Sequence, residues 1–259
     1  MKVRLVFPEL NNEIVARAVQ ECTELSGGEF EAVRAADLAE ACAKVAAGEA
    51  DGLVAGIDYT SRDVILACRD GIGAAGKTFS ASFVMKRDDE MLVIADAAAC
   101  KNPTEEQLFD IVVQTYETAR AILPGEPRVA MLSFSTLGSG GQDASIDKMR
   151  AVIDRIWNER PEIKIDGEMQ LDAAINARVA AKKAPDSPVA GQANVLILPD
   201  LNSGNILYKA MEQFGGFTAA GPILQGFKAP ASDLSRGSTV KDVVLVIETM
   251  KKLVVAHRG

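Results

Sequence analysis

The sequence predicts an α/β protein made of two mostly parallel-sheet α/β domains. Short runs rich in Val, Ile, Leu and Phe alternate with longer stretches whose apolar residues recur every three or four positions, along the whole chain of 259 residues. Hydrophobic residues make up 48% of the chain, which is enough to fill substantial cores. Strands that alternate with helices are typical of a parallel sheet covered by helices on both faces.

The predicted strands are short apolar runs that end at turn residues. In chain order they cover 3–7, 30–34, 51–56, 79–85, 91–96, 128–134, 163–166, 194–199 and 221–224. A charged turn at 86–90 separates the fourth run from the fifth, so we expect these two strands to form an antiparallel hairpin.

The predicted helices have apolar residues at helical spacing, and several begin at a residue that can cap the first turn. They cover 11–25, 38–47, 61–70, 104–123, 143–158, 170–182, 204–214 and 239–255. Trp157 is expected to belong to the core. Because the chain has no long linker, a second domain requires the chain to cross over and return. We expect a first domain from 1–88 plus 224–259 and a second from 89–223.

Charge and composition exclude several classes of function. The net charge of −8 argues against nucleic acid, for which a basic surface supplies the affinity. No apolar run reaches the length of about 18 residues that indicates a membrane helix, and the start MKVRLVFPEL is too short for a signal peptide. The four cysteines are scattered without a CxxC pair, as in reduced intracellular proteins. We therefore expect a cytoplasmic protein.

The single histidine restricts the chemistry of any active site. His257 lies third from the C-terminus of the sequence, so a Ser-His-Asp triad, a Cys-His pair or a histidine zinc site has no plausible histidine. We expect no metal site. Proton transfer would then fall to carboxylates, lysines, thiols or the substrate itself.

One glycine-rich segment matches the phosphate-binding P-loop pattern. Residues 71–78, GIGAAGKT, fit GxxxxGK[ST] and include Lys77. A P-loop requires a strand before the glycines and a helix after them, so that the amides of the helix N-terminus face the phosphates. Here a predicted helix precedes the segment and a predicted strand follows it. We therefore favour a flexible helix-to-strand turn over a nucleotide site.

Two later loops follow apolar strands, where open α/β sheets place their ligands. The first is SFSTLGSGG at 133–141, and the second is PDLNSGN at 199–205. Their small residues, hydroxyls and amides suit an anion such as phosphate. The alternative is that Ser and Asn cap helices without any ligand.

A third loop covers 233–242, DLSRGSTVKD. Thr239 and Asp242 have the spacing of a helix capping box, which is a purely structural role. In a functional role, Arg236 would bind a phosphoryl oxygen and the nearby carboxylate would act as a base. The residues alone leave both interpretations open.

Taken together, these segments resemble the phosphate acetyl/butyryl transferase family. The resemblance is continuous from about 91 to 244, whereas 9–48 share little with the family. It rests on RVAMLSFSTLGSGG (128–141), IDGEMQLDAA (165–174), KKAPDSPVAGQANVLILPDLNSGNILYK (182–209), GPILQG (221–226) and DLSRGS (233–238) with Asp242.

The resemblance implies an enzyme that transfers an acetyl or other short acyl group between acyl phosphate and coenzyme A. Ser235 and Arg236 match the family's catalytic pair, and Asp242 matches its base. It also implies two α/β domains with the active site in the cleft between them, a fold similar to isocitrate and isopropylmalate dehydrogenases, and a homodimer. Coenzyme A and phosphate would be substrates, and no cofactor would be bound.

The expected substrate-binding residues come from the loops described above and from the turn at Lys77. They are Ser133, Ser135, Thr136, Gly138, Asn202, Gly204, Asn205 and Lys77. The chain departs from the family at two arginines, which fall at Leu66 and near Thr78, and a nearby cation such as Lys77 could replace them. Two alternatives stay open: specificity for propionyl or butyryl groups, and a non-catalytic module that senses acyl-CoA or acyl phosphate.

Overall fold

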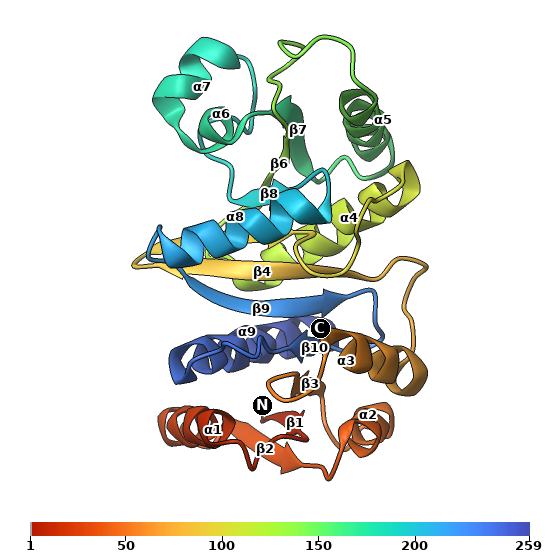
Figure 1. Ribbon diagram of the computed structural model, residues 1–259, viewed down its shortest axis with the longest axis vertical. Coiled ribbons are helices and arrows are strands. Elements are labelled where there is room, and N and C mark those ends of the chain that lie inside the picture. The colour runs from red at the N-terminus through yellow and green to blue at the C-terminus, as the bar shows by residue number, and fades with distance from the viewer. Residues whose placement is uncertain (1) are drawn as a thin grey trace. The chain divides into compact units, whose positions relative to one another are not determined.

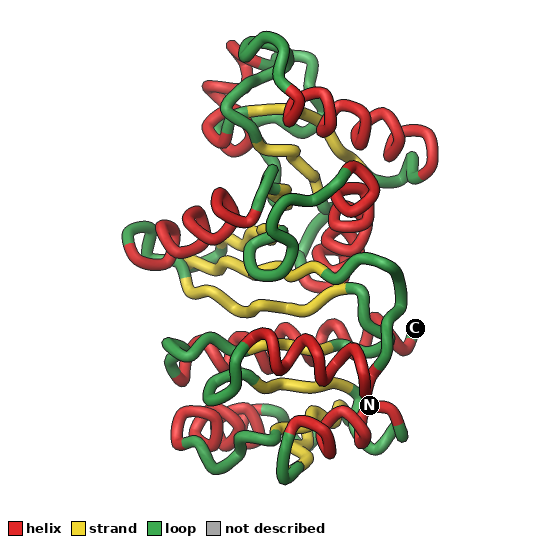
Figure 2. The backbone as a smooth tube through the Cα atoms, turned by 45° about the vertical axis from the view of Figure 1, so that its right-hand side comes forward, coloured by secondary structure: helices red, strands yellow, loops and turns green. Residues whose placement is uncertain are grey.

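The computed structural model describes residues 2–259 as two units (Figures 1 and 2). Unit 1 comprises Met1–Val84 and Thr218–Gly259, and unit 2 comprises Met85–Phe217. The division predicted from the sequence placed the two boundaries between the domains after residues 88 and 223. Each unit has its own strands and helices, and we describe each by itself.

Unit 1 has strands in the order β2-β1-β3-β10-β9-β4. Their bounds are Val3–Phe7 (β1), Phe30–Arg34 (β2), Gly52–Ala55 (β3), Ser80–Arg87 (β4), Thr218–Gln225 (β9) and Ala231–Asp233 (β10). The first boundary between the units falls within β4, whose residues 85–87 belong to unit 2. β1 pairs in parallel with β2 and β3, β3 pairs in parallel with β10, and β10 pairs antiparallel with β9. The mainly parallel character predicted from the alternation of strands and helices is confirmed.

Helices cover both faces of the unit 1 strands. α1 (Glu13–Leu25) packs against α9 (Val240–Arg258), whereas α2 (Leu38–Ala46) and α3 (Ser61–Ala67) lie together on the other side (Figure 1). α3 continues into a π-helical turn, η1 (Cys68–Ile72). The glycine-rich segment 71–78 therefore runs from a helical turn toward β4, the reverse of a P-loop, as the sequence predicted.

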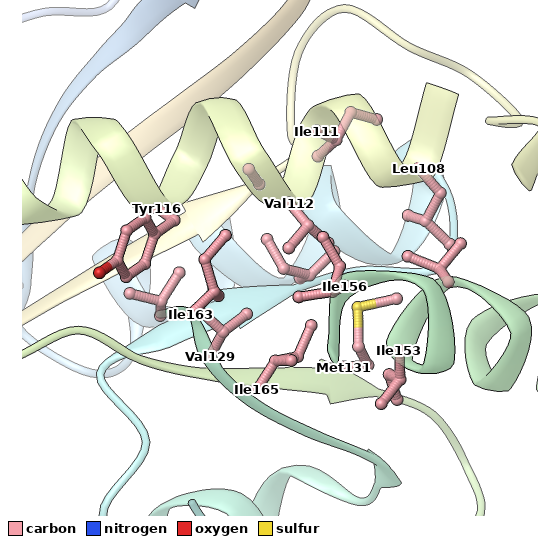
Figure 3. Packing of buried hydrophobic residues seen from close by; sticks show 14 of the residues in the cluster. Leu108, Ile111, Val112, Tyr116, Val129, Met131, Ile153, Ile156, Ile163 and Ile165 are labelled. Atoms are coloured by element: carbon pink, nitrogen blue, oxygen red, sulfur yellow. The ribbon is translucent and has the colours of Figure 1, made fainter. Parts of the chain in front are cut away.

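Unit 2 has four parallel strands in the order β5-β8-β6-β7. The strands are Glu90–Ala95 (β5), Arg128–Leu132 (β6), Lys164–Met169 (β7) and Val195–Ile197 (β8). The helices are Glu105–Ile122 (α4), Ala144–Glu159 (α5), Leu171–Ile175 (α6), Ala177–Lys183 (α7) and Leu201–Gln213 (α8). Leu108, Val112 and Ile156 belong to the apolar core that α4 and α5 form against the strands (Figure 3).

Several details differ from the sequence-based prediction. The predicted helix 170–182 is broken at Asn176, whose side chain accepts hydrogen bonds from the first amides of α7. α8 begins at Leu201 rather than 204, because Asp200 caps it. The prediction missed β10, which has only three residues. Trp157 is 52% exposed rather than buried in the core, and its indole donates to the Ile165 carbonyl oxygen.

Candidate active site

The segment with Ser235, Arg236 and Asp242 lies in unit 1 directly after β10. Because β10 is parallel to β3, this segment leaves the carboxyl edge of the sheet, where α/β proteins bind ligands. The Gly237 amide donates to the Ser235 hydroxyl oxygen (3.2 Å), and the Ser238 amide donates to the Ser235 carbonyl (2.9 Å). Ser235 and Arg236 are thus presented on a tight, exposed turn.

Asp242 forms the capping box that its spacing predicted. Its Oδ2 accepts hydrogen bonds from the Thr239 amide and hydroxyl, both at 2.7 Å, and the Thr239 hydroxyl accepts from the Asp242 amide. Oδ1 has no hydrogen bond to any residue of the described range 2–259. The cap therefore fixes the carboxylate at the start of α9 and leaves one oxygen available.

A buried carboxylate that sequence reasoning missed supports the loop after β3. Glu9, only 7% exposed, accepts hydrogen bonds from the Gly56 amide (2.6 Å) and the Asp58 amide (2.5 Å). Glu9 follows β1, so its side chain connects two neighbouring strand ends at the same edge of the sheet. No motif marked it, because its partners are backbone amides about fifty positions away in the chain.

Asp233, the last residue of β10, is a second carboxyl group that sequence reasoning did not single out. It is 1% exposed, and its Oδ1 has no hydrogen-bond partner within residues 2–259. Burial raises the pKa of Asp233 to about 6, a hydrogen bond with Ser61 acts to lower it, and the charge of Glu9 acts to raise it. The carboxyl group lies against Gly56, where a Cβ atom would collide with Oδ1.

Lys77, the expected substrate-binding residue of unit 1, is exposed in the turn between η1 and β4. It makes no hydrogen bond or ion pair with the part of the chain that the structure describes. Arg69, in η1, forms an ion pair with Asp70 (2.7 Å), so its charge is already partnered. Arg62 is exposed at the start of α3.

In unit 2, the loop 133–141 is built around the buried side chain of Glu168. This carboxylate accepts from the Ser135 hydroxyl (2.6 Å), the Gly138 amide (2.9 Å) and Arg150 Nε (2.9 Å). Although burial acts to raise it, these three hydrogen bonds hold the pKa of Glu168 below its usual value. Glu168 is therefore a charged residue that fixes the glycine-rich loop from the end of β7.

The hydroxyls of Ser135 and Thr136 are buried and take part in holding the loop. The Ser135 hydroxyl also accepts from the Gly140 amide (2.8 Å), and the Thr136 hydroxyl accepts from the Gln170 amide (3.0 Å). Ser139 Oγ accepts from the Thr136 amide (2.9 Å). The backbone amides of residues 135–141 all donate hydrogen bonds within the unit. None of these backbone amides is therefore available to an anion, although the composition of the loop suggested an anion site.

The second predicted loop of unit 2 leads into α8. Asp200 caps this helix by accepting from the Ser203 amide (2.9 Å), and Gly204 is buried against the Asp96 backbone, where a Cβ would collide. Asn205 Nδ2 makes only a long contact (3.5 Å) with the Ala97 carbonyl oxygen, and Asn202 is exposed. Gly204 thus provides close packing, whereas Asn202 is exposed and Asn205 is half-buried.

The predicted site residues are therefore distributed over the two units. Unit 1 carries Ser235 and Arg236 on the turn after β10, Asp242 in the first turn of α9, which follows that turn in the chain, and Lys77. Unit 2 carries the other expected substrate-binding residues in two loops, at 133–138 and 202–205. Among residues 2–259, no three His, Cys, Asp or Glu side chains are grouped to bind a metal ion, and no helix is long and apolar enough to cross a membrane.

Comparisons with known proteins place this arrangement in a family. Residues 27–250, which include all three loops, match the family model described as phosphate acetyl/butaryl transferase. A phosphate acetyltransferase of Clostridium acetobutylicum is 45% identical over 223 residues, covering 82% of this chain and 65% of that protein. The chain thus spans just under two thirds of the length of this relative.

Solved structures give the same result. A phosphotransacetylase from Streptococcus pyogenes has a TM-score of 0.87 and 32% identity, and the match covers 98% of this chain and 94% of that one. A branched-chain phosphotransacylase from Enterococcus faecalis has a TM-score of 0.85 at 20% identity, with 97% and 99% covered, and shows the fold alone. The expected likeness to isocitrate and isopropylmalate dehydrogenases stays a prediction. The chain belongs to the phosphate acetyl/butaryl transferase family.

Proposed function

We propose that this chain is a phosphate acetyltransferase that moves an acetyl group between acetyl phosphate and coenzyme A. The observation that carries the proposal is the segment from β10 to the first turn of α9, which presents Ser235 and Arg236 on an exposed turn and Asp242 with one unpartnered oxygen. Family membership supports the substrate class. A homodimer in the cytoplasm, with coenzyme A and phosphate as substrates and no bound cofactor, completes the proposal.

In the proposed reaction, Asp242 Oδ1 accepts the thiol proton of coenzyme A as the sulfur attacks the acetyl carbonyl carbon. A carbon–sulfur bond forms, the bond from that carbon to the bridging phosphate oxygen breaks, and inorganic phosphate leaves. Arg236 stabilises the negative charge that develops during this step, and the Ser235 hydroxyl donates a hydrogen bond to the reacting groups. No acyl group is attached to the protein.

The arrangement around Asp242 suits this role. The Thr239 amide and hydroxyl both bind Oδ2, so the carboxylate is held in one orientation before the substrate arrives. Arg236 is exposed and makes no ion pair with any other residue of the described chain, so its guanidinium is available for a phosphoryl or carbonyl oxygen.

The experiment is to mix purified protein with coenzyme A and acetyl, propionyl or butyryl phosphate in turn, and to measure acyl-CoA formation. We expect turnover to be highest with acetyl phosphate and to be lost in Arg236→Gln. The matched control is Lys241→Gln, which removes an exposed cation from the first turn of α9, five positions after Arg236, and should retain activity.

Two other results would contradict the proposal in different ways. A maximum with butyryl phosphate would show a transferase of different acyl specificity. Coenzyme A binding without turnover of any acyl phosphate would show a sensing module. The oligomeric state is tested separately by light scattering of the purified chain.

A further inference from the structure

Arg150 on α5 is held by a carboxylate that has no exposure to solvent. Its Nε donates to Glu168 Oε2 at 2.9 Å, and its Nη2 lies 3.4 Å from Oε1. The Glu168 side chain is 0% exposed, whereas the Arg150 side chain is 44% exposed. The buried partner therefore fixes the guanidinium in place while almost half of the arginine side chain remains open to solvent.

The outer part of this guanidinium is free to bind another group. A guanidinium carries five N–H donors, and Glu168 occupies one on Nε and one on Nη2. Nη1 has no hydrogen bond to any residue in the described range 2–259. Nη2 also lies close to Gly138, where an added Cβ would be 3.3 Å from it. The free donors therefore lie next to the tip of the loop 133–141.

A second arginine on the same helix shows the contrasting arrangement. Arg155 forms ion pairs with Glu106 (2.6 Å) and Glu159 (2.8 Å), and its guanidinium lies 3.8 Å from the centre of the Phe109 ring. Two carboxylates compensate its charge. Arg150 has only one carboxylate, which it shares with the Ser135 hydroxyl and the Gly138 amide, so its charge is the less compensated of the two.

The loop beside Arg150 adds hydrogen-bond donors and no acidic group. Ser139, which follows Gly138, uses its hydroxyl oxygen to accept from the Thr136 amide, so its hydrogen points elsewhere and has no acceptor among residues 2–259. The stretch SFSTLGSGG contains no Asp or Glu. The fixed guanidinium lies beside Gly138, the next residue carries an unused hydroxyl hydrogen, and the loop has no carboxylate, so this part of the surface is suited to the oxygens of an anion.

We infer that Arg150 and the Ser139 hydroxyl form a binding subsite for a phosphoryl group, with Glu168 as the positioning residue that orients the arginine. The inference rests on the proposed function, and it adds a cation in unit 2 that sequence reasoning did not identify. The phosphoryl group has two possible sources: the acyl phosphate or free phosphate, and the phosphates of coenzyme A. The planar guanidinium binds either of them with paired N–H donors.

The test measures KM for acetyl phosphate and KM for coenzyme A separately in Arg150→Gln, Arg150→Lys and the matched control Arg155→Gln. Loss of a charge-assisted hydrogen bond should raise one of the two KM values about ten- to a hundred-fold. Arg150→Lys should recover only part of the loss, because an ammonium is a point charge. Which KM rises identifies the source of the phosphoryl group. Unchanged KM values for both substrates in Arg150→Gln would overturn the inference.

Two further measurements separate this inference from misfolding and from the proposed function. Arg150→Gln leaves the Glu168 carboxylate without its cation, so the double variant with Glu168→Gln is measured as well; it should fold and show the same increase in KM. If the wild type transfers no acyl group, the subsite is tested instead by the increase in thermal unfolding temperature that inorganic phosphate produces. Protection that is lost in Arg150→Gln and kept in Arg155→Gln supports the subsite, and equal protection in all three proteins overturns it.

Discussion

The Ser135 hydroxyl donates a 2.6 Å hydrogen bond to the carboxylate of Glu168, and neither residue is exposed to solvent. The two residues are 33 positions apart, so this contact joins the loop after β6 to the end of β7. One charged side chain thereby fixes a glycine-rich loop whose own amides are already paired. The backbone amides of this loop are accordingly not available to a ligand, whereas the Ser139 hydroxyl hydrogen at its surface has no acceptor among residues 2–259.

Glu168→Gln should destabilise unit 2 by about 2 kcal/mol at pH 7, because hydrogen bonds to a charged acceptor become hydrogen bonds to a neutral one. The pKa of Glu168 is lowered in the folded chain. Its stabilisation is therefore present above the unfolded pKa of about 4.5 and is lost as the pH falls through the lower folded value. Urea unfolding at pH 7 and at pH 4 should show the difference between wild type and variant shrinking on acidification. A difference independent of pH would exclude an ionised Glu168.

Asp233→Asn should stabilise the chain at neutral pH. The folded pKa of Asp233 is raised from 3.8 to about 6, so between these values the folded chain holds a proton that the unfolded chain has released. Wild-type stability therefore decreases as the pH rises through this window, by up to about 3 kcal/mol. Asparagine carries no charge and avoids the loss. Urea unfolding at pH 7.5 should favour the variant, and the advantage should vanish near pH 4; a less stable variant at pH 7.5 would contradict the burial argument.

Gly56→Ala should cost about 3 kcal/mol or more of unfolding free energy. Gly56 has φ +113°, and an added Cβ would meet the Asp233 carboxyl group and the Leu234 backbone. The matched control is Gly48→Ala, because Gly48 also has a positive φ of +73° but has open space around it. The control should cost only about 1 kcal/mol, measured by thermal unfolding. Equal losses would mean that the Asp233 contact adds nothing.

Thr239→Ala tests whether the Thr239 hydroxyl only caps α9 or is also needed for turnover. Loss of the Thr239 hydroxyl removes the N-cap of α9 and should cost about 1 kcal/mol of stability. The Asp242 carboxylate and the Thr239 amide remain, so turnover should fall no more than a few-fold. Thermal unfolding and acetyl-CoA formation are measured on the same preparation. A complete loss of turnover in a folded variant would show that the hydroxyl itself is needed.

Much of the fold follows from local sequence, because the strands and caps depend on neighbouring residues. Thr104, for example, starts α4 through a capping box that its spacing from Gln107 makes recognisable. The three-residue strand β10 was missed because it is too short to show a period, although its register with β3 places Ser235 and Arg236. The break at Asn176 was missed because one residue ends α6 and also caps α7.

The candidate site was only partly predictable. Ser235, Arg236 and Asp242 lie within eight positions of one another, so a sequence motif can carry them. The groups that support the loops come from distant positions: Glu9 reaches Gly56, and Glu168 reaches Ser135. A single sequence has no spacing rule for such pairs. Glu168 can be seen in the segment IDGEM at 165–169, but its burial and its ion pair with Arg150 cannot be read from the sequence.

In the proposed reaction, Asp242 accepts the thiol proton in an acyl transfer to coenzyme A. This role is tested by the rate of acetyl-CoA formation from acetyl phosphate, measured for the wild type and for Asp242→Asn, which keeps an oxygen for the Thr239 cap. We expect the wild type to turn over, and the folded variant to lose activity by roughly 10²- to 10⁴-fold, as is usual when a general base is removed. A folded Asp242→Asn variant with the wild-type rate would show that Asp242 is not the base.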